Sequence, residues 1–91
     1  MPTTNQEIAE LFESMASLLK ARGDNIFKIR AYQRAARTIG QLPFSLEQAV
    51  QDGMELKGIP GVGDAISSKI REFVTTGKVT AHERLKNELP D

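Results

Sequence analysis

The stretch that decides the fold reads Leu56-Lys57-Gly58-Ile59-Pro60-Gly61-Val62-Gly63-Asp64-Ala65-Ile66-Ser67-Ser68-Lys69-Ile70. Pro60 lacks a backbone N–H and fixes its own φ, so it suits the entry to a turn and not the interior of a helix. Gly61 and Gly63 lie on either side of Val62. Glycine permits a positive φ and has no Cβ to hold another molecule away from the backbone. The pattern therefore predicts a tight turn with an accessible backbone.

A helix is predicted directly after this turn. Ile66, Ile70 and Phe73 recur at the spacing of one buried helix face. The backbone N–H groups at the start of such a helix have no partners within it, so they can bind a phosphate oxygen. The alternative is a plain connection between two helices that is closed by glycines.

The rest of the chain also predicts helices, at about residues 5–22, 26–39, 46–51, 64–76 and 80–88. Capping boxes begin at Thr4, Ser45 and Thr80, and Asn25 is the expected cap of the second helix. No segment alternates with the period of a strand. We expect an all-α fold, a compact bundle of four to five short helices. The chain is interpreted as one domain, 1–91, with the hairpin motif at about residues 46–76.

Four side chains carry expectations about burial. Phe12 is expected in the core, and Phe27 in the apolar set of the second helix with Tyr32 and several alanines. The Tyr32 ring is expected to be half-buried, with its hydroxyl on a polar partner. His82, the single histidine, is expected to be exposed and receives no role.

Composition excludes several classes of site. The 91 residues contain no cysteine, so disulfides and thiolate metal sites are excluded. One histidine excludes a histidine-rich metal site. No apolar run is long enough to span a membrane, and the N-terminus has no signal-peptide pattern. We expect a cytoplasmic protein with no membrane partner.

The formal net charge is zero, but the charges are segregated. Residues 20–37 contain six lysines and arginines against Asp24 alone, whereas residues 1–19 and 47–55 contain only acidic charges. A neutral chain with such a basic segment can still present a basic face to nucleic acid. The alternative is a solvated helix face with no partner.

The turn resembles the helix-hairpin-helix motif of DNA repair and replication proteins, which grips the DNA backbone without reading its sequence. The resemblance continues from Asn25–Ala36 through Leu42-Pro43 to Lys69 and Thr76-Gly77-Lys78. Together these residues resemble the N-terminal domain of X-family DNA polymerases, and the bacterial members most closely. Nearly the whole chain is covered.

The resemblance implies a small helical unit that binds the 5′-phosphate at a gap or nick. It implies that Lys28, Tyr32 and Lys57 match phosphate-pocket positions. It further implies that the main-chain carbonyls of Lys57, Ile59 and Val62 match ligands of a sodium or potassium ion, with no other cofactor required. The candidate DNA-binding residues are Lys28, Arg30, Tyr32, Arg34, Lys57, Gly61, Val62, Gly63 and Lys69.

Lys69 is the candidate catalytic residue, because some members of this family use the matching lysine to remove a 5′-deoxyribose phosphate. A lysine beside apolar surface and other cations gives up its proton more readily, and the neutral amine can form a Schiff base. The alternative is a non-catalytic lysine that stays protonated and contacts phosphate. Phe27, Ala65 and Ser68 replace a histidine, a lysine and a glutamate of DNA polymerase beta, and these departures favour binding over catalysis.

The leading hypothesis is therefore a sequence-independent DNA-backbone binding domain for repair at gaps or nicks. The alternatives are a 5′-deoxyribose phosphate lyase and, third, a protein-interaction domain. The chain is too short for polymerase activity of its own. We expect its partners to include further polymerase domains or a separate repair enzyme, on the nucleoid of a bacterium or archaeon.

Overall fold

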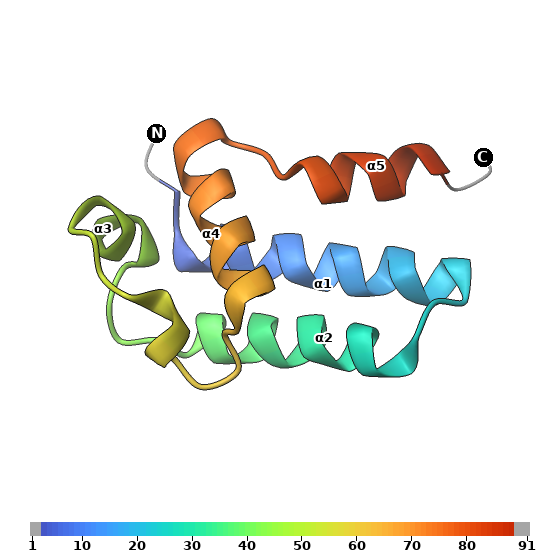
Figure 1. Ribbon diagram of the computed structural model, residues 1–91, viewed down its shortest axis with the longest axis horizontal. Helices are drawn as coiled ribbons and strands as arrows, with labels where there is room; N and C mark the ends of the chain where they lie inside the picture. Colours follow the sequence, from blue (N-terminus) through green and yellow to red (C-terminus); the bar gives the residue numbers. More distant parts are fainter. Residues whose placement is uncertain (1–2, 89–91) are drawn as a thin grey trace.

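The computed structural model describes residues 3–88, and these fold entirely into helices and their connections (Figure 1). The elements are α1 (Asn5–Arg22), α2 (Ile26–Gly40), α3 (Leu46–Gln51), the 3-10 turn η1 (Leu56–Gly58), α4 (Asp64–Thr76) and α5 (Thr80–Glu88). No strand occurs within the described range. The all-α prediction is confirmed, and the predicted helices differ from the observed ones by a residue at most.

The helices α1 and α2 form an antiparallel pair that is the centre of the fold (Figure 1). Gly23 ends α1 with a φ of +78°, and the Asn25 side chain caps α2 by accepting a hydrogen bond from the Phe27 N–H. A left-handed glycine after a helix lets the chain reverse within a few residues. α5 runs along α1 on the side away from α2, and α4 crosses this arrangement (Figure 1).

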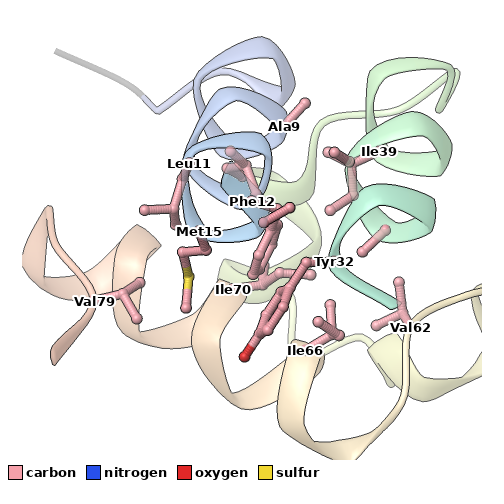
Figure 2. Packing of buried hydrophobic residues seen from close by; sticks show 14 of the residues in the cluster. Ala9, Leu11, Phe12, Met15, Tyr32, Ile39, Val62, Ile66, Ile70 and Val79 are labelled. Carbon is pink, nitrogen blue, oxygen red and sulfur yellow. The ribbon is translucent and has the colours of Figure 1, made fainter. Parts of the chain in front are cut away.

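The core lies between α1, α2 and α4. Phe12 of α1 is fully buried and stacks on Tyr32 of α2, with ring centroids 5.8 Å apart. Figure 2 shows Ile66 and Ile70 of α4 close to the same two rings. The predicted core position of Phe12 is confirmed, and so is the burial of Ile66 and Ile70 in α4, whereas Phe73 of the same predicted stripe is only partly buried.

The prediction of which α2 residues face the core is wrong near the start of the helix. Ile29, which was not assigned to the core, is buried, whereas Phe27 is 74% exposed and Ala31 is also exposed. The face that turns towards α1 runs through Ile29, Tyr32 and Ala36, a spacing of three and four residues. Tyr32 is only 5% exposed, so it lies deeper than the half-buried position that we expected.

Two sets of hydrogen bonds hold α3 and η1 in place. The Asn5 side chain donates to the carbonyl of Phe44 at 2.6 Å and accepts from the Leu46 N–H at 2.8 Å. Arg71 of α4 donates to the carbonyl of Met54 at 3.1 Å. The segment before the hairpin is thus tied at one end to α1 and at the other to α4.

The contacts that position α5 differ from the predicted capping box. Thr80 is the first residue of the helix and not its cap; its N–H and its hydroxyl donate to Oε2 of Glu72, at 2.9 Å and 2.6 Å. The expectation of an exposed His82 is also wrong. Its side chain is 15% exposed and its Nε2 lies 2.9 Å from the hydroxyl of Ser14 on α1. These contacts dock α5 on both α4 and α1.

None of the helices in residues 3–88 has the length and apolar character that a membrane span needs.

Candidate nucleic-acid interface

The hairpin turn joins η1 to α4 and has the conformation that its glycines permit. The Val62 N–H donates to the carbonyl of Ile59 at 3.0 Å, which closes the turn. Gly61 has a φ of +84°, a value that L-residues with a side chain rarely adopt. A Cβ at Gly61 would lie 3.3 Å from the Thr38 hydroxyl, so α2 also packs closely against the turn.

Gly63 has a different environment. Its φ is −93°, which any residue can adopt, and a Cβ there would meet no atom of the described chain within 4 Å. It is the N-cap of α4, and no side chain caps the helix at this position. The first N–H groups of α4 therefore face an open surface, where an external acceptor can approach the backbone.

Lys57 lies at the hairpin and forms an ion pair with Asp64, with 3.2 Å between Nζ and Oδ1. The hydrogen bond to Asp64 raises the pKa of Lys57 above its usual value. Both side chains are more than half exposed, so water screens this pair. Asp64 thus holds Lys57 beside the first turn of α4 without burying either charge.

A cavity of about 280 Å³ opens beside Tyr32, between α1, α2, α4 and α5. This volume lies just below the range of small-molecule sites, which is roughly 300–1,000 Å³. Four cationic side chains and one carboxylate line it, together with apolar side chains such as Met15 and Leu85. The charged lining residues are Arg22, Lys28, Lys69, Arg84 and Glu88. We call this cavity the cationic pocket.

Lys69 and Tyr32 form the inner part of the cationic pocket. The Nζ atom of Lys69 lies 6.0 Å from the centroid of the Tyr32 ring, at the outer limit of a cation–π contact. Lys69 is partly buried, and it forms no ion pair within the described part of the chain. The Tyr32 hydroxyl points away from Phe12 in Figure 2. The floor of the pocket is therefore an aromatic ring with a single ammonium group beside it.

The predicted binding residues other than Arg30 divide into two groups in space. Lys28, Tyr32 and Lys69 line the cationic pocket, whereas Lys57 does not and stays with the hairpin. Gly61, Val62 and Gly63 form the hairpin itself.

Arg30 and Arg34 are exposed on the opposite side of α2, two residues after Lys28 and Tyr32. The Arg34 side chain lies within 3.4 Å of the position that a Gly61 Cβ would occupy. Arg34 therefore belongs to the hairpin group.

Sequence reasoning missed Arg22 and Arg84, which also line the cationic pocket. Arg22 was part of the basic segment, so its charge was noticed but not its position. Arg84 had no local signal, because only the docking of α5 against α1 brings it to the pocket.

Residues 3–88 include no group of three or more His, Cys, Asp or Glu side chains that could hold a metal ion. The carbonyl of Ile59 accepts the Val62 N–H and keeps one lone pair, so it could still act as a ligand.

Comparison with known proteins assigns this sequence to a family. The match to the helix-hairpin-helix domain family covers residues 3–79. The chain belongs to that family. It is 35% identical over 86 residues to the DNA polymerase/3′-5′ exonuclease PolX of Bacillus subtilis (strain 168). It is 31% identical over 87 residues to DNA polymerase lambda of Arabidopsis thaliana. The resemblance to the N-terminal domain of X-family DNA polymerases is confirmed.

These alignments cover 94% and 96% of this chain, but only 14% and 16% of the two polymerases. The similarity thus concerns one small part of much longer proteins. Family membership and the two polymerase relatives support DNA as the partner of this domain.

Proposed function

We propose that this domain binds the DNA backbone without base specificity and engages a 5′-phosphate at a gap or nick. The observation that carries the proposal is the cationic pocket, in which Lys69 lies beside the Tyr32 ring and Lys28 lines the same cavity. Ammonium groups beside a small cavity favour a compact anion such as a terminal phosphate. The hairpin at the start of α4 would hold a neighbouring phosphate of the same DNA through its backbone N–H groups.

The two groups of residues would have different partners on the DNA. The cationic pocket would take the terminal phosphate, whereas the hairpin, Lys57 and Arg34 would contact the continuing backbone. Phe27 is 74% exposed and directly precedes Lys28, so it can stack on an unpaired base at the gap. Neither kind of contact reads base edges, so the binding would depend on salt and not on sequence.

The test is fluorescence anisotropy with a gapped duplex, with and without a 5′-phosphate, at two salt concentrations. We expect tighter binding to the phosphorylated gap and weaker binding as salt rises. Lys28→Gln should reduce the phosphate preference, whereas Lys20→Gln, outside the cationic pocket, should leave it unchanged. No binding at low salt would refute the proposal, and the exposed apolar residues would then favour a protein-interaction domain.

A monovalent cation is part of this proposal. The main-chain carbonyls of Lys57, Ile59 and Val62 would hold sodium or potassium, which prefer oxygen ligands, and the ion would bridge the turn to a DNA phosphate. Replacing potassium with a large organic cation at equal ionic strength should weaken binding of the wild-type domain. Equal affinity in both salts would exclude a specific ion at the hairpin.

A second candidate function is a 5′-deoxyribose phosphate lyase, and the position of Lys69 favours it. Lys69 is partly buried in the cationic pocket and no carboxylate of the described residues pairs with it. Its neutral amine would add to C1′ of the open sugar and lose water to form a Schiff base. Removal of a C2′ proton would then break the C3′–O3′ bond, and that oxygen would leave as part of the 5′-phosphate of the DNA.

The base that removes the C2′ proton has no assigned residue. Ser68 is exposed at the position where the family has a glutamate, and Glu72 is occupied by its hydrogen bonds from Thr80. Borohydride trapping on a 5′-deoxyribose phosphate end tests this function. Trapping by the wild type that is lost in Lys69→Ala and kept in Lys20→Gln, outside the cationic pocket, would support it. DNA binding without trapping would leave a binding domain only.

A further inference from the structure

The lining of the cationic pocket also includes charged residues from α1 and α5. Arg22 is the last residue of α1, and Arg84 and Glu88 lie one turn apart on α5. None of the three has a role in the resemblance to X-family polymerases. Their common position at one cavity, with two guanidinium groups and one carboxylate, calls for an explanation.

The positive charge of Arg22 is already balanced by two carboxylates. Its guanidinium donates to the carboxylates of both Asp24 and Glu88. The hydrogen bond to Asp24 raises the pKa of Arg22, and the same contact lowers the pKa of Asp24. Glu88 therefore occupies Nη1 of this guanidinium, to which an incoming anion could otherwise bind, while Asp24 occupies Nη2.

Arg84 differs from Arg22 in its ion pairs. It is exposed and lines the cationic pocket, and no described residue forms an ion pair with it. Its backbone is nevertheless fixed, because the next residue, Leu85, is buried and the helix is anchored through Thr80 and His82. A guanidinium on a docked helix can donate two parallel hydrogen bonds to one phosphate group.

We propose that Arg84 is a further phosphate-binding residue of the cationic pocket, and that Glu88 competes with the phosphate for Arg22. The incoming phosphate would bind Arg84, Lys28 and Lys69, and would displace the Glu88 carboxylate from Arg22. α5 is then part of the binding site and not only a cover for α1. This inference rests on the proposed function, because it names residues that hold the same 5′-phosphate.

The first test compares Arg84→Gln with Lys86→Gln on the gapped duplex with and without a 5′-phosphate. Lys86 is the matched control, since it is an exposed cation of the same helix that pairs with Glu83 outside the cationic pocket. Arg84→Gln should weaken binding to the phosphorylated gap about tenfold, the effect of losing a charged hydrogen bond. The slope of log affinity against log salt concentration should become less steep by about the contribution of one phosphate contact. Lys86→Gln should leave the phosphate preference unchanged.

The second test uses Glu88→Gln, which keeps the size of the side chain and removes the competing charge. Affinity for the phosphorylated gap should rise severalfold, with a smaller change for the unphosphorylated gap. Circular dichroism of each variant checks that the helices remain folded.

The outcomes separate the two claims. A wild type without phosphate preference would overturn the proposed function and this inference with it. A wild type with that preference, joined to an Arg84→Gln variant that behaves as Lys86→Gln does, would overturn the role of Arg84 alone. Unchanged or weaker phosphate binding by Glu88→Gln would overturn the competition.

Discussion

The two glycines of the hairpin should separate folding from binding when each is substituted. Gly61 has a φ of +84°, and a Cβ there would lie 3.3 Å from the Thr38 hydroxyl and 3.4 Å from Arg34. A left-handed conformation costs a residue with a Cβ roughly 1–2 kcal/mol. We expect Gly61→Ala to lower the free energy of unfolding by about that amount, and so to lower Tm by about 4–8 °C for each kcal/mol.

Gly63 should give the opposite result. Its φ of −93° suits any residue, and a Cβ would meet nothing of the described chain. Serine is a preferred N-cap residue, so Gly63→Ser should change stability by no more than a few tenths of a kcal/mol. If a DNA phosphate approaches this backbone, the new side chain would disturb a charged hydrogen bond worth about 1.5–3 kcal/mol. Affinity for DNA should then fall about tenfold or more.

Thermal unfolding and DNA anisotropy on the same variants make the comparison. Gly77→Ala is the matched control for strain, because Gly77 also has a φ of +84° but its Cβ would meet only open space. If Gly61→Ala loses more unfolding free energy than Gly77→Ala, the difference measures the crowding by Thr38 and Arg34. Wild-type DNA affinity in Gly63→Ser would show that the DNA backbone does not approach this residue. Unchanged stability in Gly61→Ala would contradict the argument from positive φ.

Three other perturbations test the packing. Phe12→Ala, which empties a fully buried site against Tyr32, should reduce the free energy of unfolding by about 3–5 kcal/mol in urea denaturation. Burial lowers the pKa of His82 below 6.5, so its contribution to stability is complete above about pH 6.5 and is lost as the pH falls through the folded-state pKa. His82→Gln should therefore flatten the pH dependence of the urea midpoint in this range. The hydrogen bond from the Thr80 hydroxyl lowers the pKa of Glu72 below 4.5, so Glu72→Gln should lower Tm at neutral pH and have little effect in acid.

The helices themselves could be predicted because their signals are local. Caps such as Asn25 and the glycines after α1 and α4 act within a few residues of the helix ends that they fix. The burial of Ile66 and Ile70 in α4 followed from spacing alone, since the two residues lie one turn apart on one face of the helix. The hairpin could be recognised because a Pro-Gly pair before an apolar-Gly pair restricts the backbone.

The side chains at the start of α2 show where local reasoning failed. Ile26, Phe27 and Ile29 are all apolar, so hydrophobicity alone could not say which one faces α1. The observed choice is Ile29, because the crossing of α1 and α2 orients the helix through Tyr32. Phe27 is left on the surface beside Lys28.

Only some of the residues that line the cationic pocket could be predicted from the sequence. Lys28, Tyr32 and Lys69 were found through the resemblance, since that resemblance follows the residues before and after the hairpin. Arg84 comes from a helix whose docking depends on long-range hydrogen bonds between Glu72 and Thr80 and between Ser14 and His82. No spacing rule within α5 contains this information.

The three residues between α1 and α2 have a consequence for the order of folding. Gly23, Asp24 and Asn25 connect the two longest helices, so the contacts between them close a short loop and are entropically favoured to form first. We expect the α1–α2 pair to dominate the folding transition state, with φ-values near zero in the hairpin and α5. Substitutions in the hairpin and in α5 would then speed unfolding while leaving the folding rate nearly unchanged. The chain could thus alter the residues of these two segments during evolution without slowing the step that creates its fold.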